Sequence, residues 1–68
     1  MHISYNSKHD LLYIRFSYED KPVRNERFDE DIVFDIDADD KIVGMEILDA
    51  SKRIDLRDLL TVRVAGAN

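Results

Sequence analysis

Apolar and polar residues alternate along much of this chain with a period of two, which is typical of β-strands. The alternation is strongest between Asp31 and Leu48, where two segments rich in β-branched residues lie on either side of an acidic stretch. Two such segments joined by a short polar connection predict a β-hairpin. This hairpin is the main structural signal in the sequence.

A three-residue loop at Ala38–Asp40 sets the expected pairing of the two hairpin strands. Such a loop contains a type I turn followed by a left-handed residue, which here is Asp40. Gly is the usual residue at that point, although Asp tolerates the conformation better than most. The pairs expected from this loop are Asp37 with Lys41, Ile36 with Ile42, Phe34 with Gly44 and Val33 with Met45.

Two weaker strand signals precede the main hairpin. Alternation in residues 3–5 and 11–17 predicts a first hairpin. The segment Val23–Phe28 is charged and follows Pro22, which cannot donate a ladder hydrogen bond, so it is expected at a sheet edge.

After the main hairpin the period changes to that of a helix. Asp49 or Ser51 can cap a helix from Ala50 to about Val62, with Asp55 as the point where it could break. One face of this helix would carry Leu56, Leu59 and Leu60. The tail Thr61–Val64 is also compatible with a final strand, because three of its four residues are β-branched.

These elements predict an α+β fold. We expect an antiparallel sheet of four to five strands, connected as a meander of hairpins, with one C-terminal helix packed on one face. A chain of 68 residues is expected to form a single small domain over residues 1–68, with a core of limited size.

The expected register gives both faces of the main hairpin large apolar side chains. One helix can cover only one face, so the other is expected to contact a second molecule, most simply in a twofold homodimer. The first hairpin adds Tyr13 to that face. The residues expected at the interface are Val33, Val43, Met45, Ile47 and Tyr13.

Composition narrows the class of protein. The formal charge of −5 repels nucleic-acid phosphates and favours a basic protein partner. Cysteine is absent, so disulfides cannot form and Cys-based zinc or redox chemistry is excluded. The sequence shows no apolar run of membrane-span length and no signal-like leader, and we expect a cytoplasmic protein.

Four acidic residues in the main hairpin have the spacing of a calcium loop. Asp35, Asp37, Asp39 and Glu46 occupy the first, third, fifth and twelfth places of an EF-hand-like pattern. The sixth place, which requires Gly for a sharp turn, is Asp40, and the flanking segments alternate like strands and not like helices. We therefore interpret this segment as an acidic hairpin turn and expect no metal site.

No catalytic set is expected either. The two histidines, His2 and His9, are too few to make a convincing zinc site without cysteine. His9 is next to Asp10 and close to Ser7, but residues within one flexible turn do not build a catalytic triad. We expect no cofactor and no catalytic residues.

Three segments of the chain resemble domain-of-unknown-function family 2283, a family of short prokaryotic proteins. The segments are Ile3–Asn6, Asp10–Phe16 and Ile42–Arg53, of which the last is the most specific. The sequence departs from the family pattern by having Asn6 for an acid, Asp40 for the turn Gly and Met45 for Ile. The resemblance implies a small sheet-rich fold without an established activity. Members also look like partners of toxin-like proteins.

The function expected from these observations is that of a non-enzymatic protein-interaction module, comparable to an antitoxin that partners a small toxin-like protein. The alternative is a small-ligand or metal-binding module that uses the acidic hairpin turn.

Overall fold

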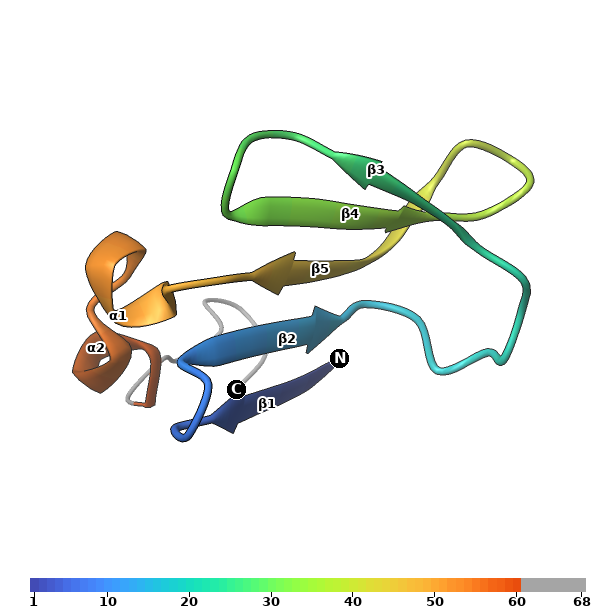
Figure 1. The fold of residues 1–68 in the computed structure, drawn as a ribbon. Helices are drawn as coiled ribbons and strands as arrows, with labels where there is room; N and C mark the ends of the chain where they lie inside the picture. Colours follow the sequence, from blue (N-terminus) through green and yellow to red (C-terminus); the bar gives the residue numbers. More distant parts are fainter. Residues whose placement is uncertain (61–68) are drawn as a thin grey trace.

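The computed structural model of the protein describes residues 1–60, with residues 59 and 60 described only by their place in a helix. Five strands form one antiparallel sheet in the spatial order β1-β2-β5-β4-β3, and two short helices follow the last strand (Figure 1). The elements are β1 (His2–Asn6), β2 (Leu11–Arg15), β3 (Arg24–Arg27), β4 (Ile32–Ile36), β5 (Ile42–Ile47), α1 (Ala50–Arg53) and α2 (Leu56–Leu60). The expected antiparallel sheet is therefore confirmed, and the four to five strands predicted are five.

The strands do not form a simple meander. β1 and β2 form one hairpin, and β3, β4 and β5 form a three-stranded meander, but β2 pairs with β5 and not with β3. The connection over residues 16–23 carries the chain to the opposite edge of the sheet (Figure 1). This arrangement places the apolar strands in the centre and the charged β3 at an edge, where its charges remain in water. The edge position predicted for β3 is confirmed.

The turn of the main hairpin is as predicted, but the register beyond it is not. Asp40 is left-handed with φ 62°, and the Asp37 amide donates to the Lys41 carbonyl at 2.9 Å. Ile36 pairs with Ile42, and a β-bulge then makes Val43 an extra residue. From there Asp35 pairs with Gly44, Phe34 with Met45, Val33 with Glu46 and Ile32 with Ile47.

The bulge changes which side chains share a face of the sheet. A one-residue shift moves side chains to the opposite face, so Met45 and Ile47 lie on the same face as Phe34. The other face is mainly polar and carries Tyr13, Arg15, Asp35 and Glu46, with Val33 among them. The expectation of two apolar faces was wrong, because it assumed a register without a bulge.

The core lies between the apolar face and the helices. Leu12 and Ala50 are fully buried and Ile47 is 3 % exposed. Partly buried side chains from the sheet and from the helical segment pack around these three: Ile14, Ile32, Met45, Ile54 and Leu56. Phe34 is only half-buried, so the centre of the core is on β2 and β5 and not at the aromatic residue of β4.

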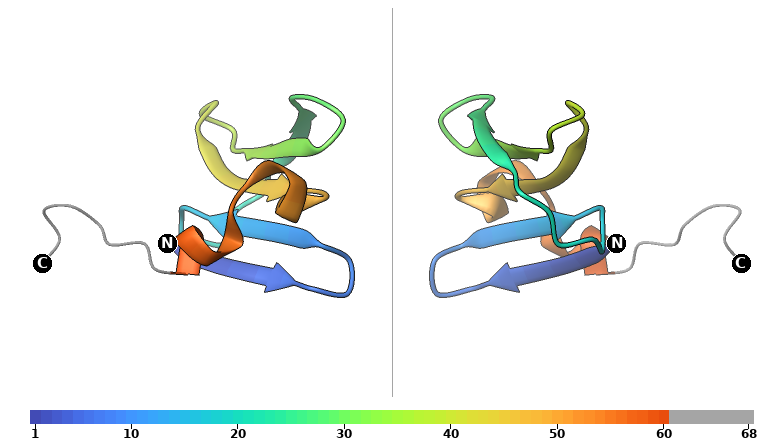
Figure 2. Two further views of the ribbon diagram at one scale, coloured as in Figure 1. Left: turned by 90° about the vertical axis from the view of Figure 1, so that its left-hand side faces the viewer. Right: turned by 90° about the vertical axis from the view of Figure 1, so that its right-hand side faces the viewer.

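The C-terminal segment forms two helices where one was predicted. Ile54 is extended, with φ −138° and ψ 140°, and this ends α1 immediately before the expected break at Asp55. The Asp55 carboxylate accepts the Arg57 amide at 3.0 Å and so begins α2. Both helices lie at the end of the sheet where β5 ends (Figure 2). The proposed final strand at Thr61–Val64 lies outside the described residues.

The predicted caps of the first helix are not used. Asp49 is at the N-cap position but is left-handed and makes no side-chain capping bond. Instead, Asp10 in the β1–β2 turn accepts the Ser51 amide at 3.0 Å and the Ser51 hydroxyl at 2.6 Å. The Asp10 carbonyl also accepts the Ala50 amide. A residue of the first hairpin therefore caps α1.

None of the described helices is both long and apolar enough to cross a membrane.

Candidate interaction surface

The five residues predicted at an interface do not form one surface. Val43 and Ile47 are buried, at 4 % and 3 % exposed, and Met45 is half-buried on the helix-covered face. Val33 and Tyr13 lie on the opposite, polar face. Three of the five residues therefore pack within the chain, apart from the other two.

The four carboxylates with calcium-loop spacing are also separated. Asp35 is on the polar face and accepts hydrogen bonds from Tyr13 Oη at 2.9 Å and from the Asn25 side-chain amide. Glu46 is on β5, across from Val33. Asp39 contributes its amide to the turn. Within residues 1–60 no group of three or more acidic or imidazole side chains is arranged to hold a metal ion.

Asp37 shows how these carboxylates are used. Its Oδ1 accepts the amides of Lys41 at 3.0 Å and Asp39 at 2.9 Å, and its Oδ2 is 3.2 Å from Lys21 Nζ. The Lys41 amide, with further help from Lys21, holds the pKa of Asp37 below its usual value. The carboxylate is 3 % exposed. Its oxygens stabilise the hairpin turn and the connection that contains Lys21.

A second polar cluster supports the middle of the sheet. Tyr13 Oη donates to Asp35, and burial together with this bond raises the pKa of Tyr13, although Arg15 lowers it in part. Gly44 lies directly beneath this contact, since a Cβ there would be 2.8 Å from Tyr13 Oη. Asp35 is 6 % exposed and has partners on both sides. The cluster has a structural role.

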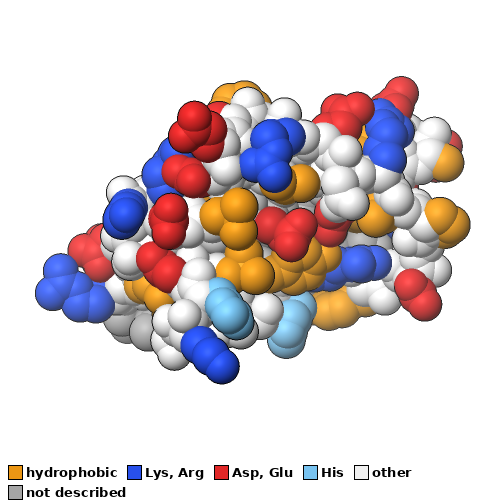
Figure 3. Space-filling view, in the orientation of Figure 1, with side chains coloured by type: hydrophobic (Ala, Val, Ile, Leu, Met, Phe, Trp, Pro, Cys, Tyr) orange, Lys and Arg blue, Asp and Glu red, His pale blue; other side chains and the backbone are white. Residues whose placement is uncertain are grey.

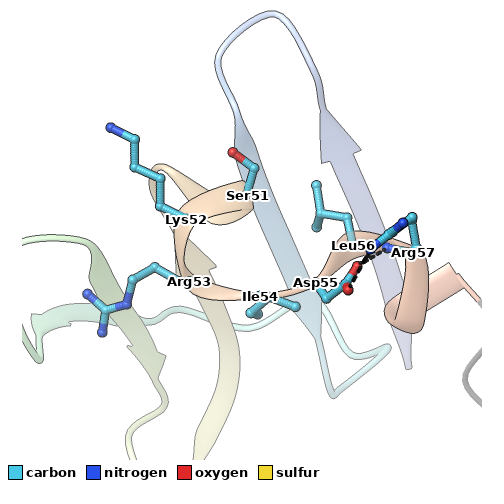
Figure 4. Close-up of a pocket in the computed structure, with 7 residues that line it drawn as sticks. All are labelled: Ser51, Lys52, Arg53, Ile54, Asp55, Leu56 and Arg57. Carbon is cyan, nitrogen blue, oxygen red and sulfur yellow. Dashed lines mark hydrogen bonds and ion pairs between the residues drawn. The ribbon is translucent and has the colours of Figure 1, made fainter.

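A hollow with a volume of about 530 Å³ lies along the two helices. It is lined by residues 51–57, and Figure 4 shows the side chains of Lys52 and Arg53 extending away from it. Arg57 forms an ion pair with Asp55 across its rim at 3.2 Å. A small-molecule site usually has several polar groups that converge on the ligand. That arrangement is lacking among the side chains that line this hollow.

An exposed phenylalanine, Phe28, begins the turn that joins β3 to β4. Phe28 is 69 % exposed, and its ring meets Phe34 edge to face with 5.8 Å between centroids. Its amide donates to the Ile32 carbonyl at 2.8 Å. We call Phe28, Phe34 and the acidic turn Asp29–Asp31 the Phe28 corner.

The Phe28 corner is held in place by hydrogen bonds from its own turn. Asp29 Oδ1 accepts the amides of Asp31 at 2.8 Å and Ile32 at 2.9 Å. Arg27 adds a bond from its guanidinium to the Glu30 carbonyl at 2.8 Å. These bonds fix the backbone that carries Phe28.

Arg53 of α1 ties the same turn to the helical end of the molecule. One guanidinium nitrogen is 2.8 Å from Asp29 Oδ2 and the other is 3.2 Å from Asp31 Oδ2. The guanidinium holds the pKa of Asp29 below its usual value. Arg53 therefore neutralises part of the turn, while Glu30 remains exposed. On the side of the molecule that Figure 3 shows, acidic and basic side chains are interspersed with apolar ones.

Residues 2–51 match the model of a family described as a protein of unknown function, DUF2283. The chain belongs to this family. The match runs from β1 to the first turn of α1, so it covers the whole sheet, and it ends before Arg53 and α2. No curated protein and no solved structure matches the chain.

The structure explains why the DUF2283 segments go together. Asp10 of one segment caps Ser51 of another, and Tyr13 of one lies over Gly44 of another. Asn6, one of the departures, accepts the amides of Lys8 at 3.0 Å and His9 at 3.2 Å and so supports the first turn. These pattern residues maintain the fold.

Sequence reasoning missed the Phe28 corner. The strand pattern predicts only that Phe28 ends a weak edge strand, although a large aromatic residue between a charged strand and an acidic turn is an available signal of an exposed contact residue. The Arg53 contact could not be found from local spacing, because its partners are more than twenty residues away in the chain.

Proposed function

We propose that the protein is a non-enzymatic protein-interaction module that binds its partner through the Phe28 corner. The observation that carries the proposal is an aromatic side chain that is 69 % exposed on a turn fixed by hydrogen bonds and by Arg53. Exposed aromatic residues are typical anchors of protein interfaces. A fixed backbone reduces the entropy that is lost on binding.

The partner we propose is a basic protein with an apolar pocket for Phe28. The acidic turn next to the ring and the net charge of −5 favour cationic side chains at the rim of that pocket. More specifically, we propose an antitoxin-like role, in which the partner is a small toxin-like protein.

The non-enzymatic part of the proposal is supported by how the polar side chains are used. Asp10, Asp35 and Asp37 each accept hydrogen bonds that join separate segments of the fold. These carboxylates stabilise the fold. General acid–base catalysis, by contrast, requires groups within hydrogen-bond reach of a bound substrate.

The proposal is tested by affinity capture with the tagged full chain, comparing wild type with Phe28→Ser. We expect the wild-type chain to retain a basic protein at a fixed stoichiometry and Phe28→Ser to lose it. Tyr18→Ser is the matched control, because Tyr18 is 81 % exposed and lies on the connection outside the corner. This control should retain the partner.

Circular dichroism spectra of both variants establish that they are folded. Glu30→Lys, which reverses a charge beside the ring, should weaken capture without abolishing the fold. A partner retained equally by wild type and by folded Phe28→Ser would refute the role of the corner.

A further inference from the structure

The two edges of the sheet differ in how they are protected. β3 carries Arg24, Glu26 and Arg27, and charges of this kind discourage pairing with another strand. β1 has the sequence His-Ile-Ser-Tyr-Asn, without lysine, arginine, aspartate or glutamate, and each of its residues is exposed. β2 is its one neighbour in the described sheet. Within residues 1–60, β1 is thus an edge strand (Figure 1), and the outer row of its backbone amides and carbonyls has no partner strand.

The sequence of β1 is complementary to itself in an antiparallel pair. A twofold axis at Ser4 pairs all five residues of the strand, with Ser4 opposite Ser4, Ile3 opposite Tyr5 and His2 opposite Asn6 of the second copy. Ile3 and Tyr5 are both partly exposed on the apolar face, so the pairing extends that face across the axis. The pairing brings no like carboxylates or cations together.

We infer that the protein forms a twofold homodimer by antiparallel pairing of β1 with β1 of a second copy. The two sheets then become one continuous sheet of ten strands. This surface is at the opposite edge from the Phe28 corner, so the inference does not depend on the proposed function. Specific interfaces usually bury about 1,200–2,000 Å², more than one short strand provides. The dimer is therefore a concentration-dependent one.

The test uses two variants of opposite charge at the axis. In the full chain, Ser4→Lys and Ser4→Asp each place like charges directly opposite one another in the dimer. Sedimentation equilibrium from micromolar to millimolar concentration should show wild-type dimers. Each variant should show a dissociation constant raised by about fivefold or more. A mixture of the two variants should associate at least as tightly as wild type, because Lys then faces Asp.

The controls separate this surface from others. Ser7→Lys introduces the same charge in the exposed β1–β2 turn, outside the strand, and should dimerise like wild type. Phe28→Ser should also leave the dimer intact, so the dimer and the partner-binding role can fail separately. Amide exchange in β1 should slow as protein concentration rises.

Three results would overturn the inference. One is a wild-type chain that is monomeric at millimolar concentration. Another is a mixture of the Lys and Asp variants that associates no better than either alone. The third is exchange protection of β1 that does not depend on concentration, which would show that the edge is occupied within one chain.

Discussion

Three buried residues form the centre of the core: Leu12, Ile47 and Ala50. Leu12 is fully buried, with 0 % of its surface exposed, whereas Phe34 is half-buried next to Phe28. Leu12→Ala is expected to lower the free energy of unfolding by about 2–5 kcal/mol. Phe34→Ala should lower it by less, in spite of its larger side chain. Urea denaturation of both variants measures this order, and the reverse order would place the core on β4.

At Gly44, the addition of a single Cβ atom should lower the stability of the protein. A Cβ at this residue would be 2.8 Å from Tyr13 Oη and 3.0 Å from Asp35 Oδ2, so Gly44→Ala should destabilise the protein by about 1–3 kcal/mol. In a Tyr13→Phe background the nearest of these atoms is gone. The cost of Gly44→Ala should then be smaller, which a double-mutant cycle of denaturation measures. Equal costs in both backgrounds would contradict the crowding argument.

The sequence predicted one of the three left-handed aspartates. Asp40 was identified because the hairpin loop requires a left-handed residue at that place, and its φ is 62°. Asp10 and Asp49 have φ values of 52° and 50° but lie where no loop length was specified by the pattern. Both lie where the first hairpin meets α1, and this contact joins residues that are about forty positions apart in the chain.

At the scale of elements, the strands were predictable and their register was only partly so. The uninterrupted register put Phe34 opposite Gly44, and thus paired a large apolar residue with no side chain. The observed bulge pairs Phe34 with Met45 and Ile32 with Ile47, apolar with apolar on one face. That matching of side chains was present in the sequence and favours the bulged register. The order of strands, by contrast, depends on β2 meeting β5, which requires tertiary packing.

The cap of α1 is a contact between elements and can be tested as one. Asp10→Asn keeps the size of the side chain but removes its charge and one acceptor oxygen, so the Ser51 contacts should weaken and the melting temperature should fall. Asp20→Asn makes the same change in the exposed connection and serves as the control. Thermal denaturation compares the two. Equal melting temperatures for both variants would show that Asp10 does not stabilise α1.

At the scale of the whole molecule, the stability of the fold should decrease at low pH. The pKa values of Asp10, Asp29, Asp37 and Asp55 are all lowered by hydrogen bonds and cations in the fold. A carboxyl whose pKa is lower when folded contributes stability above its unfolded pKa and loses it as the pH falls through the folded value. The melting temperature should therefore be level near neutral pH and fall below about pH 4.

Lys21 should make the stability of the fold decrease at high pH as well. The pKa of Lys21 is raised above 10.5, chiefly by Asp37, so its contribution is complete below that value and is lost as the pH rises through the folded value. Melting curves collected from about pH 2 to about pH 7 test the acid side. A melting temperature that stays constant down to about pH 2 would show that these carboxylates contribute little.

The capping of α1 by Asp10 also has a consequence for the order in which the chain folds. Forming the first turn of a helix is unfavourable on its own, and α1 has only four residues. Its cap is 41 residues earlier in the chain, in the turn that leads into β2, and β2 pairs with β5. We therefore expect α1 to have no stable form before the two hairpins join. The Ser51 amide, in hydrogen-exchange experiments, should exchange only when the central strand pair opens, and thus report on the unfolding of the entire sheet.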